Sequence, residues 1–248
     1  MTVISIGIQK GGVGKTTSTA ALAEALSLKG YRVLVIDLDP QSSLSEIYRV
    51  DTDGRGIGQV LEGELELRDI LVKTDTGFFL APTDISLAET EVSLSGRMES
   101  QYILKDVLEQ LSGADFVLID CPPSLGTLTI NALVASDYVL IPVEPAILEM
   151  RGLRLFLATI ERIQKRLNPE LKIAGILATK MKSRVVHHRQ GIERLKSANL
   201  PLLEGIEIAS SISVAEAAAA PMSIVSYRPD SPQAQAYTAL AEYLETLR

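Results

Sequence analysis

A glycine-rich segment near the N-terminus holds the residue types that bind phosphate. It reads Lys10-Gly11-Gly12-Val13-Gly14-Lys15-Thr16-Thr17 and comes shortly after an apolar run, Val3–Ile8. The stretch that follows, Lys15–Lys29, is predicted as a helix. In such a strand–loop–helix unit the loop N–H groups and the positive end of the helix dipole converge on one point, which suits a polyphosphate. Glycines are needed because a Cβ would keep the backbone away from the phosphate oxygens. We therefore expect a phosphate-binding loop rather than a turn without a ligand.

Two side chains of this loop have the chemistry to act on a nucleotide. Lys15 supplies a positive charge to the β- and γ-phosphates, and the Thr16 hydroxyl is a ligand for Mg²⁺. The segment departs from the general phosphate-loop pattern, because Gln9 stands where the first glycine is expected and Lys10 follows it. Lys10 is then either a second phosphate contact or a solvated loop charge.

Two acidic segments follow other predicted strands. Asp37-Leu38-Asp39-Pro40-Gln41 comes after the second strand, and Asp120-Cys121-Pro122-Pro123-Ser124 comes after the fourth. The carboxyl ends of the strands of a doubly wound sheet meet at one edge, so Asp39 and Asp120 should lie beside the phosphate loop. Mg²⁺ prefers a few carboxylates acting through its waters, and hydrolysis needs a group that orients the attacking water. Asp37, Cys121 and Pro122 could have a direct role in the site. Their interpretation as strand-end or turn residues is at least as good.

Strand-like and helix-like stretches alternate along the whole chain. The predicted strands are Val3–Ile8, Val33–Ile36, Phe78–Ala81, Phe116–Ile119, Tyr138–Val143 and Ile173–Ala178. The predicted helices are Lys15–Lys29, Leu87–Ser95, Gln101–Leu111, Leu128–Ala135, Leu148–Leu167, Val185–Ser197, Ser213–Ala219 and Gln233–Leu247. This order predicts an α/β fold with a doubly wound, mainly parallel twisted sheet and helices on both faces, in a single domain over residues 1–248.

Composition narrows the class of protein. Hydrophobic residues make up 46% and aromatic residues 4% of the 248 residues, as in globular α/β proteins rich in small aliphatic side chains. The apolar runs are too short to cross a bilayer, and strand-like sequence starts at residue 2, where a signal peptide would be. A single cysteine, Cys121, excludes an internal disulfide and favours a reducing cytoplasm. It also leaves too few thiolates for a zinc or iron–sulfur site built by one chain.

The charge is distributed unevenly. The chain carries a formal net charge of −7, yet the segment 151–200 holds twelve basic and three acidic residues, a net +9. We expect part of it to neutralise DNA phosphates without reading bases, and an ordinary set of solvated helix faces is the alternative. Because aromatic residues are nearly absent there, base stacking is not expected and duplex is favoured over single strands. The candidate DNA contacts are Lys180, Lys182, Arg184, Arg189, Arg194 and Lys196, with Arg151 and Arg154. His187 and His188 are expected to be exposed residues, not metal ligands.

Taken together, the Lys10–Thr17 loop, the Asp37–Gln41 box and the Asp120–Ser124 box resemble those of the ParA/MinD class of ATPases, which have a deviant Walker A loop. The resemblance covers nearly the whole chain and is greatest to the short, Soj-like form. Because the first strand follows Met1 directly, we do not expect an N-terminal winged-helix domain. It implies ATP and Mg²⁺ as cofactors and ATP hydrolysis as the activity.

The resemblance also implies roles for residues. Lys10 would reach the nucleotide of a second subunit, so that ATP holds a homodimer together, and Gly11 would lie at the closing interface. Lys15 would act on the phosphates, Asp39 would orient the attacking water, and Thr16, Asp39 and Asp120 would serve the metal. The expected nucleotide contacts are Gly11, Gly12, Val13, Gly14, Lys15, Thr16, Thr17 and, through an adenine pocket around Thr179–Met181 and Tyr227–Asp230, Pro229.

For the biological role, the resemblance implies non-specific binding of double-stranded DNA, a cytoplasmic and nucleoid-associated location, and positioning of a cargo. A ParB-like or other adaptor would stimulate hydrolysis. The cargo could be a plasmid, a chromosome or a protein body such as a carboxysome, and the sequence leaves this choice open.

Two other classes compete with this interpretation. A MinD-like ATPase would hold a membrane through a basic amphipathic C-terminal helix, whereas the last residues here include Glu242 and Glu245 and suit docking on the domain. An ATP-dependent synthase or amidation enzyme of the cobyrinic-acid type shares the fold. A nitrogenase-reductase-like electron carrier is excluded, because it needs two cluster-ligating cysteines per subunit.

Overall fold

The computed structural model describes residues 1–145, 150–182 and 186–248. Its strands are β1 (Thr2–Ile6), β2 (Val33–Asp37), β3 (Val72–Lys73), β4 (Phe79–Ala81), β5 (Phe116–Asp120), β6 (Tyr138–Val143), β7 (Lys172–Met181) and β8 (Leu202–Ala209). Its helices are α1 (Lys15–Leu28), α2 (Ser43–Ile47), α3 (Ile57–Glu62), α4 (Leu87–Ser95), α5 (Ile103–Glu109), α6 (Thr127–Ala135), α7 (Met150–Arg166), α8 (Val186–Ser197), α9 (Ile212–Ala219), α10 (Ile224–Tyr227) and α11 (Pro232–Glu245), with short 3₁₀ helices η1 (Leu67–Asp69) and η2 (Ser100–Tyr102).

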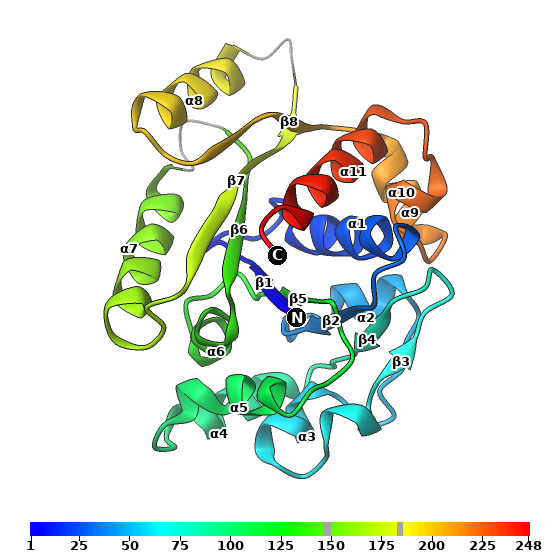
Figure 1. The fold of residues 1–248 in the computed structure, drawn as a ribbon, viewed down its shortest axis with the longest axis vertical. Helices are drawn as coiled ribbons and strands as arrows, with labels where there is room; N and C mark the ends of the chain where they lie inside the picture. The colour runs from blue at the N-terminus through cyan, green and yellow to red at the C-terminus, as the bar shows by residue number, and fades with distance from the viewer. Residues whose placement is uncertain (146–149, 183–185) are drawn as a thin grey trace.

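The strands form one sheet in the order β3-β4-β2-β5-β1-β6-β7-β8 (Figure 1). All neighbours pair in parallel except β3 and β4, which are antiparallel. In the central strands successive residues point to opposite faces. Ile4 and Leu118 pack against α1 and α11 on one face, while Val3 and Val117 belong to the core under α3 to α6 on the other. The predicted doubly wound sheet with helices on both faces is confirmed.

Two helices on the α1 side of the sheet are held by polar groups as well as by apolar packing. Glu24 of α1 is fully buried and accepts hydrogen bonds from the Tyr48 hydroxyl at 2.7 Å, from the Ser223 N–H and hydroxyl at 2.8 and 2.6 Å, and from the Ser226 hydroxyl at 2.6 Å. A buried carboxylate is tolerated only when it is satisfied in this way. Glu24 therefore fixes α10, and Tyr48 just after α2, to α1.

The last helix packs with the core. Ser231 caps α11 by accepting from the Ala234 N–H at 3.2 Å, and Pro232 stands in its first turn. Leu240 and Leu244 are fully buried, and the Tyr237 hydroxyl lies 3.0 Å from the hydroxyl of Ser18 on α1. The apolar face of α11 is thus used inside the protein.

Several elements were not predicted. The edge strand β8 contains Glu204, Gly205 and Glu207, so it lacks the apolar run that identifies the central strands, and Gly205 has φ 81°. Strand β3 has two residues, and α2, α3 and α10 are four to six residues long, too short for a periodic pattern. The other predicted elements are present with small shifts at their ends, and positions 148, 149 and 185 of two predicted helices lie outside the described residues.

Candidate nucleotide-binding site

The glycine-rich loop connects β1 to α1 and leaves the start of α1 open. Gly12 and Gly14 have φ 72° and 91°, values that L side chains rarely adopt. Gly14 is the N-cap of α1 and supplies no side chain to the first N–H groups of the helix. The loop is also fixed by β7, because the Thr179 hydroxyl near the end of this strand donates to the Val13 carbonyl at 2.7 Å. Val13 itself is buried in the core, so only its backbone can serve a ligand.

The two lysines of the loop have different surroundings. Lys15 is only 6% exposed, and its Nζ donates to the Lys10 carbonyl at 3.3 Å across the loop. Lys10 is half-buried, and Gly11 and Gly12 beside it are exposed. A Cβ added at Gly11 would meet no atom within 4 Å in the described part of the chain. Lys15 therefore lies within the loop, whereas the loop is open at Gly11 and Gly12.

The two acidic segments meet where β2 and β5 end. Asp37 and Asp120 are register partners in these strands, and both are fully buried. Burial, together with the neighbouring Asp37, raises the pKa of Asp120 to about 8, and burial raises the pKa of Asp37 to about 6. The Thr19 hydroxyl donates a hydrogen bond to Oδ1 of Asp120 at 3.3 Å, and the Thr16 hydroxyl opposes the rise of the pKa of Asp120.

Asp120 retains one unused oxygen. Its Oδ2 is buried and has no hydrogen-bond partner among the described residues. A metal-bound water that donates to this oxygen would satisfy it. The described residues contain no cluster of three His, Cys, Asp or Glu that could hold a metal by themselves. A Mg²⁺ ion at this point would therefore depend on Thr16, Asp120 and the oxygens of a nucleotide, which fits its preference for a few protein ligands and retained waters.

Asp37 has a structural role that the sequence left open. Its Oδ2 accepts from the Ser45 N–H and hydroxyl at 2.9 and 2.8 Å, and its Oδ1 accepts from the Asp39 N–H at 3.3 Å. Asp39 is 8% exposed, and its Oδ1 accepts from the Gln41 N–H at 3.1 Å. Asp37 therefore shapes the turn that holds Asp39.

A cavity of about 100 Å³ adjoins the phosphate loop. It is lined by Gly14, Thr17, Thr179, Lys180, Ile208, Ala209, Ser210, Ser211, Val214 and Tyr237. Thr179 and Lys180, which were expected near an adenine pocket, line this cavity, whereas the lining from β8 was not expected because β8 was not recognised as a strand. That this cavity holds adenine stays a prediction. Pro229 and the other residues of 227–230 are exposed and do not line this cavity, so their contact with a nucleotide stays a prediction.

Comparison with known proteins agrees with this geometry. The model of a family described as an AAA domain matches residues 1–173. The sporulation initiation inhibitor protein Soj of Bacillus subtilis is 36% identical over 245 residues, which cover 97% of this chain and 96% of Soj. The chain belongs to the ParA/MinD class of P-loop ATPases. The chromosome partitioning protein ParA of Caulobacter vibrioides is 40% identical over 190 residues, 71% of this chain and 68% of that protein.

A solved structure of similar fold carries a ligand. Cobyrinic acid a,c-diamide synthase from Mycobacterium smegmatis, solved with an ATP analogue and magnesium, superposes with a TM-score of 0.88 at 36% identity and covers 100% of this chain and 97% of that one. The expected cofactors of this ParA/MinD-class chain, ATP and Mg²⁺, agree with that structure.

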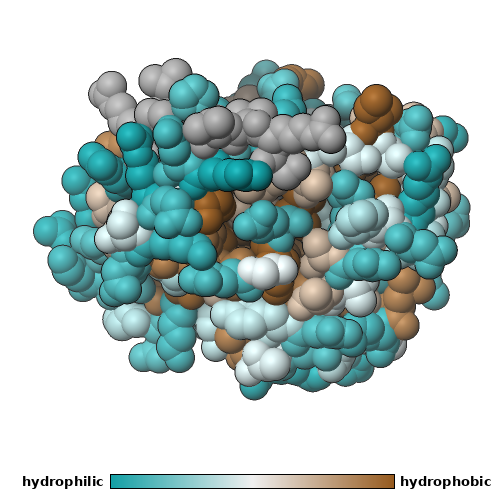
Figure 2. Space-filling view, turned by 90° about the horizontal axis from the view of Figure 1, so that it is seen from above, coloured by the Kyte–Doolittle hydropathy of each residue, from teal (hydrophilic) through white to brown (hydrophobic). Residues whose placement is uncertain are grey.

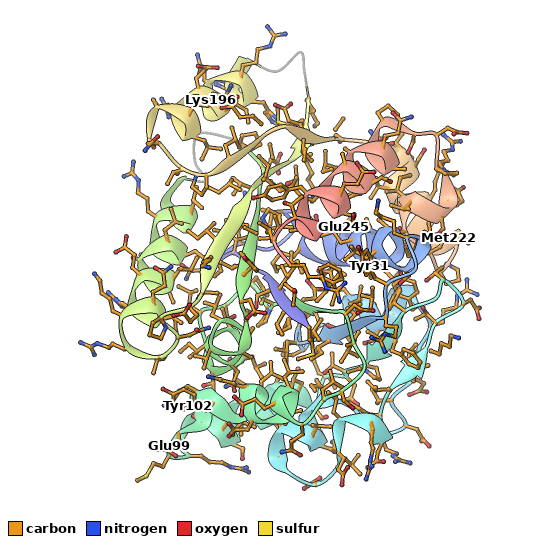
Figure 3. The ribbon with its side chains drawn as sticks, in the orientation of Figure 1. Tyr31, Glu99, Tyr102, Lys196, Met222 and Glu245 are labelled. Atoms are coloured by element: carbon orange, nitrogen blue, oxygen red, sulfur yellow. The ribbon has the colours of Figure 1, made fainter. Side chains whose placement is uncertain are left out.

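The basic residues of this ParA/MinD-class chain are partly brought together by α8. Arg189, Arg194 and Lys196 are exposed on this helix, and Lys180 and Lys182 are exposed just before it. Arg189 and Lys196 are seven residues apart and share one side, whereas Arg194 lies on the other flank of the buried face. Figure 3 shows Lys196 on α8, at the opposite end of the molecule from Glu99. Seen from the α8 side, the surface is mostly hydrophilic (Figure 2). Arg154 is exposed on α7, while Arg184 and the side chain of Arg151 lie outside the described residues.

One expectation in this region was wrong. His188 is buried, not exposed, because α8 packs closely on the end of β6. Its Nδ1 accepts from the Lys182 N–H at 3.4 Å, and its Nε2 lies 4.0 Å from Glu144. A Cβ at Gly191 would overlap the Pro145 carbonyl oxygen, so the glycine permits α8 to pack closely on the end of β6. His187 is exposed, as expected. Within the described residues no helix is long and apolar enough to span a bilayer.

Proposed function

We propose that this chain hydrolyses ATP with Mg²⁺ as a face-to-face dimer that binds DNA and positions a cargo. The observation that carries the proposal is the contrast between the two loop lysines. Lys15 is buried within its own loop, whereas Gly11 and Gly12, next to Lys10, are exposed and have no side chain to keep a second chain away. This open side supports the proposal that Lys10 contacts a nucleotide held by a partner.

For hydrolysis, each residue has a task that fits its position. Lys15 and the free N–H groups at the start of α1 neutralise negative charge on the β- and γ-phosphate oxygens. Asp39, held by the turn that Asp37 shapes, orients a water molecule in line with the γ-phosphorus. The water oxygen bonds to phosphorus as the bond between the γ-phosphorus and the β–γ bridging oxygen breaks, and ADP leaves with that electron pair. Thr16 and Asp120 would hold Mg²⁺, which stabilises the charge on the phosphates.

DNA binding rests on α8 and the residues before it. Arg189 and Lys196 lie together on one side of α8, with Lys180 and Lys182 nearby in the chain, and all four are exposed. Side chains of this kind neutralise phosphates without reading sequence. The C. vibrioides relative is by name a chromosome partitioning protein, which supports partition or positioning as the task. A nucleoid-associated ATPase released by an adaptor of the ParB type, or by another cargo adaptor, would perform it.

The first experiment measures phosphate release and DNA retention of the purified protein. We expect hydrolysis that requires Mg²⁺ and is lost in Asp39→Ala, and binding to a non-specific duplex that requires ATP and weakens steeply with salt. Asp53→Ala, an exposed aspartate of a surface turn, is the matched control. DNA binding that is equally strong without nucleotide would contradict the proposal.

An ATP-dependent amide synthase is the second candidate, because the similar M. smegmatis structure bears the name of such an enzyme. The cavity beside the phosphate loop, about 100 Å³ in the described part of the chain, is small for a molecule the size of cobyrinic acid. Cys121, the one cysteine, is buried, and burial raises its pKa to about 12, so it is a poor nucleophile. Hydrolysis of ATP without any added acid or amine substrate separates the two candidates.

A further inference from the structure

Glu91 of α4 lies against the start of α6, the helix that follows the Asp120 loop. Its Oε1 accepts a hydrogen bond from the Leu128 N–H at 3.3 Å. Leu128 is the second residue of α6, and this N–H is one that an N-cap side chain normally satisfies. The N-cap position is occupied by Gly126, which has no side chain. Glu91, which lies on another helix, therefore supplies the hydrogen-bond acceptor that an N-cap side chain usually supplies.

The glycine and the glutamate fit one another. A Cβ added at Gly126 would overlap Oε1 of Glu91, and it would also lie 3.1 Å from the carboxyl carbon. The Gly126 backbone is extended, with φ −85° and ψ −167°, so backbone conformation does not require glycine here. A side chain at position 126 would therefore have to displace the carboxylate of Glu91.

The segment that Glu91 caps belongs to the predicted reaction site. Residues 121–126 connect Asp120 to α6, and their first residue is tied to β1 by the Cys121 N–H, which donates to the Ile6 carbonyl at 3.2 Å. At the other end the Thr129 hydroxyl donates to the Ser124 carbonyl at 2.7 Å. Pro123 and Ser124 between these bonds are exposed. The position of this loop therefore depends on where α6 begins, and Glu91 fixes that point.

We propose that Glu91 is a positioning residue for ATP hydrolysis, which sets the start of α6 and through it the loop that follows Asp120. The proposal rests on the proposed hydrolysis. A negative charge at the first turn of α6 also interacts favourably with the helix dipole, so the contact is stronger than a neutral cap.

The test compares kcat, KM for ATP and the Mg²⁺ concentration for half-maximal rate in three variants. Glu91→Ala removes the acceptor and should lower kcat about tenfold, as the loss of other residues that hold metal ligands does, with KM nearly unchanged and a higher Mg²⁺ requirement. Glu91→Gln keeps an acceptor oxygen and should retain most of the rate. Glu89→Ala removes an exposed glutamate from the same helix and should match the wild type.

A double-mutant cycle adds an independent readout. Gly126→Ala pushes a methyl group into the carboxylate and should lower kcat, and Glu91→Ala in the same chain should cost little more, because the two changes disturb one contact. Three results would each overturn the proposal. They are an unchanged kcat in Glu91→Ala, equal losses of kcat in Glu91→Gln and Glu91→Ala, and additive losses of kcat in the double variant.

Failure of the proposed function can be told apart from failure of this inference. If the wild-type protein bound ATP without hydrolysing it, the proposed hydrolysis would fail. Hydrogen exchange at the Leu128 amide would still test the cap, because it should be faster in Glu91→Ala than in Glu89→Ala, and equal exchange in the two would overturn the inference.

Discussion

Asp37 and Asp120 stand side by side as register partners at the ends of β2 and β5, with both carboxyl groups buried. Burial disfavours the charged form of each carboxyl group and raises both pKa values, and the neighbouring Asp37 raises the pKa of Asp120 further. The pair is tolerated because Ser45 donates to Asp37, and because the Thr19 hydroxyl donates to Asp120. A bound Mg²⁺ would favour the charged form of Asp120.

The pH dependence of stability follows from this pair. The folded protein keeps a proton on Asp37 up to about pH 6 and on Asp120 up to about pH 8, whereas the unfolded chain loses both near pH 4. The folded state therefore binds more protons than the unfolded state between these pH values, so the free energy of unfolding should fall as pH rises from about 4 to about 8. The fall is at most about 1.4 kcal/mol per pH unit for each proton. Urea unfolding of the nucleotide-free protein at several pH values measures this.

The Asp120→Asn variant is the control for the same experiment. It cannot release a proton at this position, so its stability should change less than that of the wild type between pH 6 and 8. Mg²⁺ with ATP should also reduce the dependence, since it favours the ionised carboxylate. A parallel fall of the wild type and Asp120→Asn over this range would show that the carboxyl group is not the cause.

Thr179 should matter for nucleotide affinity because it fixes the phosphate loop. Thr179→Val removes the hydroxyl that donates to the Val13 carbonyl and should weaken binding of a fluorescent ADP analogue by a factor corresponding to about 0.5–1.5 kcal/mol. The matched control is Thr159→Val, which removes a hydroxyl bonded to the Leu155 carbonyl on α7, far along the chain from the loop. Equal affinities in the two variants would rule out this role.

DNA binding should respond in opposite directions to a change on α8 and a change on the neighbouring β8. Arg189→Ala should weaken binding to any duplex and reduce the slope of log affinity against log salt by about one. Glu204 lies 3.3 Å from Lys196 and offsets its charge, so Glu204→Gln should strengthen binding. Fluorescence anisotropy with ATP at several salt concentrations measures both effects. Arg248→Ala, at the far end of the chain, should leave binding unchanged, and weakening by Glu204→Gln would contradict the proposed surface.

Gly11 should tolerate a side chain in the monomer but not in the dimer. A Cβ there meets nothing within 4 Å in the described part of the chain, so Gly11→Val should fold and bind ATP. If the second subunit closes on this side of the loop, the variant should lose ATP-dependent dimers. Gly96→Val is the matched control, because Gly96 is also exposed with open space around it. Normal dimers of Gly11→Val with ATP would show that the interface lies elsewhere.

The sequence was sufficient for features that repeat or stay local. The runs in β1, β2 and β5 are apolar on both faces, so a buried parallel sheet could be predicted, and the phosphate loop lies in one continuous segment. Features made by residues far apart were missed. Nothing in the local sequence connects Glu91 with Gly126 or predicts that Ser45 satisfies Asp37, and β8 contributes to the cavity although its own pattern is irregular. His188 was misjudged because its burial depends on the packing of α8 against Pro145.

The most direct test of the proposed ATP-dependent dimer uses sedimentation velocity on Asp39→Ala, in which ATP should persist. With ATP and Mg²⁺ this variant should sediment as two chains, and with ADP as one. Adding Lys10→Ala should return the ATP-bound protein to a single chain while ATP remains bound, because Lys15 and the start of α1 are intact. An ATP-bound Asp39→Ala protein that stays monomeric, or a Lys10→Ala double variant that dimerises fully, would contradict the proposed function.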